Sequence, residues 1–327
     1  MYNLLVYFVL IVFVFVVLSL PLILGNTTAM AEHIVASAQD TTEANNSPTV
    51  GGLITVGGTT AALCASIVTA TEAAGIPVVS FDLEGGTGDD GTTACDGSTH
   101  QIRTRQSDTA IADMVLAQAA HDTTAGVVGP DGRPGPTPVG YVNDLHYEPL
   151  KIRNVEWETY RKKYNWEQEF FVDQAATYTT APALQDAIRA QLRAATTSTN
   201  TTIQFVYAPW DYLAINTVQV LQDDNYTTTK VYGADINNED IQAMIAPQSP
   251  WFATAGGHPE MIGAALLRMN LLQLANASTN EFEQMPSFLF TQEFLLQEQV
   301  TNLDELLIAM PELRMQDIAS ACWIDPL

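Results

Sequence analysis

Residues 52–82 read GLITVGGTTAALCASIVTATEAAGIPVVSFD, two short apolar runs separated by a longer alanine-rich segment. The first run, residues 52–56, predicts a strand followed by a Gly-Gly turn. Residues 59–75 predict a helix that threonine caps at its start and Gly75 closes at its end. Residues 76–82 predict a second strand, and its continuous apolar character is typical of a parallel sheet covered on both faces. This strand–helix–strand unit predicts an α/β fold.

The alternation of strands and helices continues along the rest of the chain. Further strands are expected at 33–37, 125–129, 170–173, 203–208, 230–235, 252–255 and 287–290, and helices at 108–120, 150–164, 183–195, 211–222, 238–246 and 259–276. The Gly/Asp/Thr-rich segment 84–100 and the Pro/Gly-rich segment 129–140 predict connections without regular structure. We therefore expect an open, parallel α/β sheet that occurs twice, once in each of two Rossmann-like lobes.

Composition limits the classes of function. The chain has 327 residues, of which 47% are hydrophobic, which suits two lobes of roughly 120–150 residues. Its 13 basic and 37 acidic residues give a net charge of −24, which argues against nucleic acid and anionic membrane surfaces as partners. Cys64, Cys95 and Cys322 include no CxxC pair, which excludes a zinc ribbon, an iron–sulfur cluster and a disulfide scaffold. One disulfide with one free thiol, or three free thiols, both stay open.

The N-terminus suggests export. Residues 4–24 are apolar and uncharged, and a bilayer core of ~30 Å needs about 20 such residues. A secretory signal usually has a shorter apolar core and a basic start, yet residues 29–31 (Ala-Met-Ala) resemble a cleavage site. A cleaved signal and an uncleaved membrane anchor therefore both stay open, as does a misjoined gene model. The first two place the protein outside the cell or in the periplasm.

No motif for catalysis, metals or cofactors accompanies the expected strands. There is no GxSxG elbow, no HExxH and no His/Cys metal pair. Ligands of open α/β sheets bind at the carboxyl ends of strands, near the point where the strand order reverses. The residues that directly follow strands are Asp82, Trp210, Asp211 and Asp235, and none of them follows a Walker or GxGxxG loop. We expect no cofactor, no metal and no catalytic residues.

Five segments resemble, in the family's order, motifs of the type 1 periplasmic binding proteins of the ribose- and galactose-binding branch. They are GGLITV to AGIPVVSFD (51–82), the helix start RNVEW (153–157), IQFVYAPWDYLAINTVQVLQ (203–222), KVYGADINNEDIQAMI (230–245) and PWFATAGGHPEMIGAALLRMNLLQL (250–274). The resemblance spans about residues 50–300. It implies two Rossmann-like lobes, joined by several strands, that close on a sugar or another small polar ligand.

The resemblance also implies a set of ligand-binding residues: Asp82, Arg153, Tyr178, Trp210, Asp235 and His258. The two aspartates would accept hydrogen bonds from ligand hydroxyls, and Arg153 would donate a forked pair. Trp210 stands where the family has asparagine, so a stacking face would replace a hydrogen-bonding group. Each residue also has a structural alternative, because an aspartate after a strand can cap a helix, an arginine can be solvated and an aromatic ring can fill the core.

The sequence departs from the family at its start. The family's first strand and helix are missing, and the apolar N-terminus stands in their place, so the chain resembles an N-terminally truncated member. We expect residues 1–31 to be the signal or anchor, residues 32–105 and 236–285 to form lobe 1, and residues 106–235 and 286–327 to form lobe 2.

The sequence therefore favours an exported or membrane-tethered solute-binding protein that captures a sugar-like ligand, with a membrane transporter or receptor as its partner. Two alternatives stay open. One is a membrane-tethered interaction domain that has lost ligand binding. The other is a hydrolase on the same fold, using Asp82 or Asp235 together with His258, although no nucleophile–base pair is visible.

Overall fold

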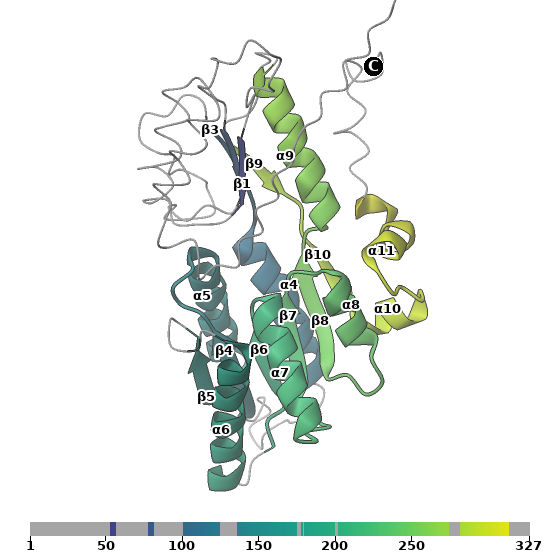
Figure 1. Cartoon of the computed structure of the whole chain (residues 1–327). Coiled ribbons are helices and arrows are strands. Elements are labelled where there is room, and N and C mark those ends of the chain that lie inside the picture. The colour runs from purple at the N-terminus through teal and green to yellow at the C-terminus, as the bar shows by residue number, and fades with distance from the viewer. Residues whose placement is uncertain are drawn as a thin grey trace, which may run out of the picture. The chain divides into compact units, whose positions relative to one another are not determined.

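The computed structural model describes residues 53–56, 78–81, 101–124, 136–174, 178, 180–199, 202–274 and 282–313. The chain divides into two compact units. Unit 1 consists of Met1–Gly85, Thr93–Arg103 and Met269–Phe282, and unit 2 consists of Gly86–Thr92, Thr104–Arg268 and Glu283–Leu327. Most of the described elements belong to unit 2 (Figure 1).

Several sequence predictions lie outside the described residues. These are the apolar segment 4–24, the strands 33–37 and 125–129, the helix 59–75, the three cysteines and the candidate ligand residue Asp82. Among the helices that the structure does describe, none has the length and apolar character needed to cross a membrane.

A four-stranded sheet has the order β1-β2-β3-β9, from β1 (Leu53–Val56), β2 (Val78–Phe81), β3 (Gln101–Gln106) and β9 (Phe282–Met285). β1 and β2 run parallel, with Leu53 opposite Val78. These are the two strands that the apolar runs predict, and both are confirmed. Val78, Val79 and Phe81 are buried, as expected of a covered parallel strand. β3 was not predicted, because its sequence QIRTRQ contains only one apolar residue.

The larger sheet lies in unit 2 and has six strands in the order β10-β8-β7-β6-β4-β5. They are β4 (Thr137–Asn143), β5 (Trp166–Asp173), β6 (Phe205–Ala208), β7 (Lys230–Ala234), β8 (Trp251–Gly256) and β10 (Phe288–Thr291). All neighbours pair in parallel except β10, which is antiparallel to β8. The predicted α/β class with a mostly parallel sheet is confirmed.

The prediction for the Pro/Gly-rich segment 129–140 was wrong from Thr137 onward. Thr137–Asn143 is β4, which lies between β5 and β6. Pro138 and Gly140 are residue types that favour loops, which is why the sequence predicted one. In the structure, a register shift between Val139 and Gly140 accommodates them within the ladder to β5. Gly140 is also required sterically, because a β-carbon there would overlap the ring of Phe170 on the neighbouring strand.

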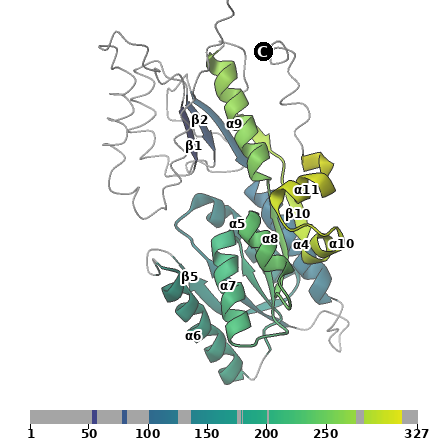
Figure 2. The same cartoon turned by 45° about the vertical axis from the view of Figure 1, so that its right-hand side comes forward.

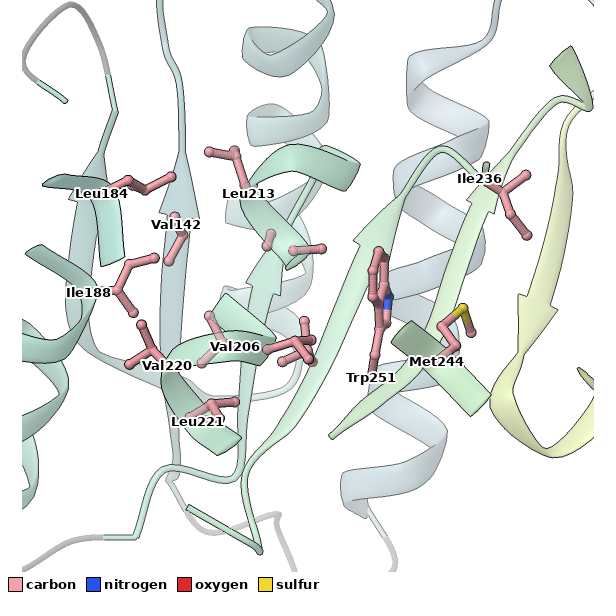
Figure 3. Close-up of a cluster of buried hydrophobic side chains, with 14 of the residues drawn as sticks. Val142, Leu184, Ile188, Val206, Leu213, Val220, Leu221, Ile236, Met244 and Trp251 are labelled. Atoms are coloured by element: carbon pink, nitrogen blue, oxygen red, sulfur yellow. The ribbon is translucent and has the colours of Figure 1, made fainter. Parts of the chain in front are cut away.

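Helices cover both faces of the six-stranded sheet. α4 (Asp108–Thr124) and α5 (Glu148–Lys163) supply one apolar cluster, and α6 (Ala181–Thr199), α7 (Asp211–Asp223) and α8 (Asn238–Ile245) supply the other. Strand β6 shows why both faces are apolar. Phe205 and Tyr207 join the first cluster, whereas Val206 and Ala208 join the second. Figure 3 shows the second cluster, where Val206 lies among aliphatic side chains from α6 and α7.

The remaining helices are α9 (Pro259–Leu274), α10 (Gln292–Gln297), α11 (Leu303–Ala309) and a single 3-10 turn, Pro311–Leu313 (Figure 2). The boundary between the units differs from the predicted one. We expected residues 236–285 in lobe 1, but α8, β8 and α9 as far as Arg268 belong to unit 2. The reason is pairing, because β8 adds in parallel to β7 and α8 makes the short crossover between them.

We expect Gly140→Ala to lower the free energy of unfolding by about 1–3 kcal/mol, because the added methyl group overlaps Phe170 in a packed core. Denaturant titration followed by circular dichroism would measure it. Gly263→Ala in α9 is the matched control. Gly263 is exposed and has open space around it, so the change should be neutral or stabilising by up to ~1 kcal/mol. Equal effects at both positions would contradict the packing argument.

Candidate functional site

The strand order of unit 2 reverses between β4 and β6. β5 lies on one side of β4, and all later strands lie on the side of β6. The helix after β4 covers one face of the sheet and the helix after β6 covers the other, and open α/β sheets bind ligands at the carboxyl ends of strands at such a point. The residues that follow β4 and β6 therefore form the candidate site.

Aromatic residues occupy the first position of both helices at this point. Tyr147 is the N-cap of α5 and Trp210 is the N-cap of α7, and neither makes a side-chain capping hydrogen bond. Their ring centroids lie 6.0 Å apart in an edge-to-face arrangement, and Trp210 also contacts Tyr212 at 5.4 Å. Ser, Thr, Asp or Asn at an N-cap stabilises a helix by about 1 kcal/mol through a side-chain hydrogen bond, which an aromatic residue does not supply. Helix stability therefore does not explain this choice of residues.

Tyr178 is the other aromatic residue that the resemblance predicted. It is half-buried, and it packs against the apolar cluster that Tyr147 and Trp210 also border. The structure thus brings the two predicted aromatic residues to one cluster. Tyr147 joins them, and sequence reasoning missed it because it follows β4, the strand that was not recognised.

Arg153 points back from α5 to the same edge and is almost fully buried. Its Nε donates to Asp108 Oδ1 at 2.8 Å, and its Nη1 donates to the carbonyl oxygen of Pro209 at 2.5 Å. Two longer contacts, of 3.4 and 3.5 Å, join Nη1 and Nη2 to the carboxylate of Asp235. The alternative of a solvated Arg153 is therefore wrong, and two of the predicted residues, Arg153 and Asp235, are brought into direct contact.

Asp235 follows β7 in a strained backbone conformation. Its φ is +70°, in the left-handed region that residues other than glycine rarely adopt. Its N–H donates to Ala255 at 2.8 Å, and its carbonyl accepts the hydroxyl of Thr254 at 2.7 Å. Gly256 makes room for it, since a β-carbon there would lie 2.9 Å from the Asp235 Cα. Strain of about 1–3 kcal/mol that neighbours hold in place is common at binding sites.

Two further carboxyl groups adjoin Asp235. The side-chain amide of Asn237 donates to Asp211 Oδ2 at 3.0 Å. Burial, followed by the charge of Asp235, raises the pKa of Asp211 to about 6. Burial, followed by the charge of Asp211, raises the pKa of Asp240 to about 8. Asp240 also completes a capping box with Asn237 at the start of α8.

His258 takes a structural position instead of a place beside these groups. It is fully buried, its Nδ1 accepts the N–H of Glu260 at 3.2 Å, and its Nε2 lies 3.2 Å from the carbonyl oxygen of Leu303. Because Nδ1 acts as an acceptor, Nε2 carries the hydrogen and donates a hydrogen bond to the carbonyl oxygen of Leu303. Both ring nitrogens are thus used to start α9 and to hold α11, and we do not carry His258 into the candidate site.

Asp108 is the other residue that sequence reasoning missed. It is the first residue of α4, where an aspartate looks like an ordinary helix-start residue. No local sequence pattern predicts its hydrogen bond to Arg153, because Arg153 lies 45 residues further along the chain. Among the described residues, no three His, Cys, Asp or Glu side chains are grouped to hold a metal ion.

Comparisons with known proteins bear on the fold. No protein-family model matches the chain, and no curated protein matches it. Among solved structures, the chain is similar to a 5-methylthioribose transporter solute-binding protein from Thermotoga lettingae, with a TM-score of 0.72, 24% identity, and coverage of 91% of this chain and 83% of that one.

Two further solved structures have the same fold. A sugar ABC transporter protein from Yersinia enterocolitica has a TM-score of 0.70 and 19% identity, with 92% of this chain and 82% of that chain covered. A periplasmic solute-binding protein from Actinobacillus succinogenes with bound D-allose has a TM-score of 0.64 and 14% identity, with 83% and 84% covered. The fold is thus that of the type 1 periplasmic binding proteins, as the resemblance predicted.

The pKa of Asp240 predicts a pH-dependent stability. A carboxyl with a pKa of about 8 in the folded chain and about 4 when unfolded binds more protons when folded, so stability falls as pH rises between these values. The slope for one group is at most about 1.4 kcal/mol per pH unit. Asp240→Asn removes the titrating group but keeps an acceptor for the N–H of Asn237, so it should flatten the slope.

Urea unfolding at pH 5, 6, 7 and 8 would measure this difference between the wild type and Asp240→Asn. Glu239→Gln is the control, because it removes an exposed carboxylate from the same helical turn and should leave the slope unchanged. The same slope in the wild type and in Asp240→Asn would show that Asp240 does not hold a proton in the folded chain.

Proposed function

We propose that this protein captures a small, uncharged, hydroxyl-rich ligand, a sugar or a close relative, without catalysing a reaction. The observation that carries the proposal is the pair of Arg153 and Asp235 at the carboxyl edge of the unit 2 sheet, next to aromatic side chains at the strand-order reversal. The fold shared with sugar-binding transporter components supports it.

The chemistry of these groups suits a sugar. A sugar hydroxyl both donates and accepts, so Asp235 can accept from one hydroxyl while Arg153 donates to its neighbour. Trp210 offers a ring face on which the C–H groups of a sugar ring can stack. We propose Tyr178 as a second aromatic contact, and Asp82 as a further acceptor on the evidence of the sequence resemblance alone.

Charge argues for an uncharged ligand rather than a phosphate or a carboxylate. The guanidinium of Arg153 already has two carboxylates as partners, Asp108 and Asp235. Asp211 adds negative charge nearby, because its raised pKa of about 6 leaves most of it ionised at neutral pH, whereas Asp240, with a pKa of about 8, is mostly protonated there. An anionic ligand would therefore meet more negative than positive charge at this edge.

The hydrolase alternative lacks an available general base. His258 was the only candidate to work with Asp235, and both of its ring nitrogens are bonded within the protein. The proposal also includes export, membrane tethering and a transporter or receptor as partner. These parts depend on the N-terminal sequence. An interaction domain without ligand binding is the alternative that the experiment below distinguishes.

The full chain should be stabilised against thermal unfolding by at least one member of a panel of D-ribose, D-allose, D-galactose, allitol and 5-methylthioribose. A ligand at 100 times its Kd adds about 2.7 kcal/mol. Arg153→Met and Asp235→Ala should abolish this shift, because each removes one half of the hydroxyl-binding pair.

Arg161→Met is the matched control on the same helix. Arg161 is partly exposed and pairs with Glu158, so the shift should survive its loss. No shift with any panel member would favour the interaction domain, whereas a shift that survives Arg153→Met would place the binding site elsewhere.

A further inference from the structure

We propose that Asp108 is a positioning residue, which aims the guanidinium of Arg153 toward the ligand. This inference rests on the proposed function and deepens it. Three elements supply the contacts of the guanidinium: Asp108 opens α4, Pro209 follows β6 and Asp235 follows β7. The two shortest contacts, 2.8 Å to Asp108 and 2.5 Å to Pro209, hold Nε and Nη1.

Exposure separates the partners of Arg153 into an inner and an outer set. The side chain of Asp108 is 3% exposed and that of Arg153 is 5% exposed, whereas that of Asp235 is 29% exposed. A dissolved ligand can therefore reach Asp235 but not Asp108. The contacts on the Asp235 side, at 3.4 and 3.5 Å, are also the longest that Arg153 makes here, so a ligand hydroxyl can replace them at the smallest cost.

Helix capping does not explain Asp108. The capping bond of α4 comes from the preceding residue, because Ser107 Oγ accepts the N–H of Ala110 at 3.1 Å. The carboxylate of Asp108 instead accepts the Nε–H of Arg153 from another helix. Asp108 thus lies one residue after the cap and directs its carboxylate at a buried cation.

The two aspartates compete for one cation. Asp108 and the Pro209 carbonyl fix the guanidinium plane from the inner side, which leaves the Nη2 edge toward Asp235. Without the Asp108 charge, the guanidinium would be drawn to Asp235 alone and would close the position that a ligand hydroxyl takes. Loss of Asp108 should therefore weaken binding even where the fold survives.

The test compares Asp108→Asn, Asp108→Ala and the wild type as full chains. Asparagine keeps an acceptor oxygen for the Arg153 Nε–H but removes the charge. Asp108→Asn should therefore fold, and it separates the loss of charge from misfolding. Asp113→Asn is the control, because Asp113 is an exposed carboxylate on the same helix that bonds to Tyr160 at 2.6 Å. The first readout needs no ligand: the Arg153 Nε–H resonance and its exchange with solvent, assigned by its loss in Arg153→Met.

The second readout is the Kd for whichever of D-ribose, D-allose and 5-methylthioribose stabilises the wild type most. We expect Asp108→Asn to speed exchange of the Nε–H and to raise the Kd about tenfold or more, with a larger effect in Asp108→Ala. We also expect Asp113→Asn to change neither quantity.

The two proposals can fail separately. An unchanged resonance, or an unchanged Kd in a folded Asp108→Asn chain, overturns the positioning role while the proposed function stands. If the wild type binds no member of the five-ligand panel, the proposed function and the ligand-directing role both fail, and the Nε–H resonance still decides whether Asp108 holds Arg153.

Discussion

A buried guanidinium must be paired, and that constraint organises the site of this protein. Removing one partner of a buried ion pair costs about 3–5 kcal/mol, because the other charge is left without compensation. Arg153 meets the constraint with contacts from α4, β6 and β7, so the elements around the strand-order reversal are held to one another by a polar contact as well as by apolar packing. The same contacts direct Nη1 and Nη2 toward the partly exposed Asp235, so one buried charge supports both the fold and the site.

The sheet topology determines where this contact can lie. β4 and β6 are neighbours, yet the helices that follow them cover opposite faces of the sheet. The two connections therefore leave the carboxyl ends of these strands in opposite directions. Asp235 follows β7, the next strand along, and its left-handed backbone turns its carboxylate toward Arg153. Gly256 on β8 makes that backbone conformation sterically acceptable. The geometry of the site thus extends across four adjacent strands.

The sequence predicted what local patterns encode. Short apolar runs identified β1 and β2, and the motif resemblance identified Arg153 and Asp235 without showing that they touch. It failed where tertiary contacts override local signals. β4 looks like a loop because Pro138 and Gly140 interrupt it, and only pairing with strands on both sides makes it a strand. Asp108 could not be found from a pattern, because its partner lies on another helix and only the packed fold brings the two together.

Several local costs in unit 2 lie at this edge, although positive φ angles also occur away from it, at Asn165, Asn225, Gln248 and Gln299. α8, α10 and α11 begin with Asn237, Thr291 and Asn302, whose side chains cap them in the ordinary way. Asn237 caps α8 beside the candidate site, whereas Tyr147 and Trp210 open α5 and α7 without such bonds. The strained Asp235 and the raised pKa values of Asp211 and Asp240 lie at the same carboxyl edge. Departures of several kinds that converge on one place are the pattern expected when residues are retained for binding rather than for stability.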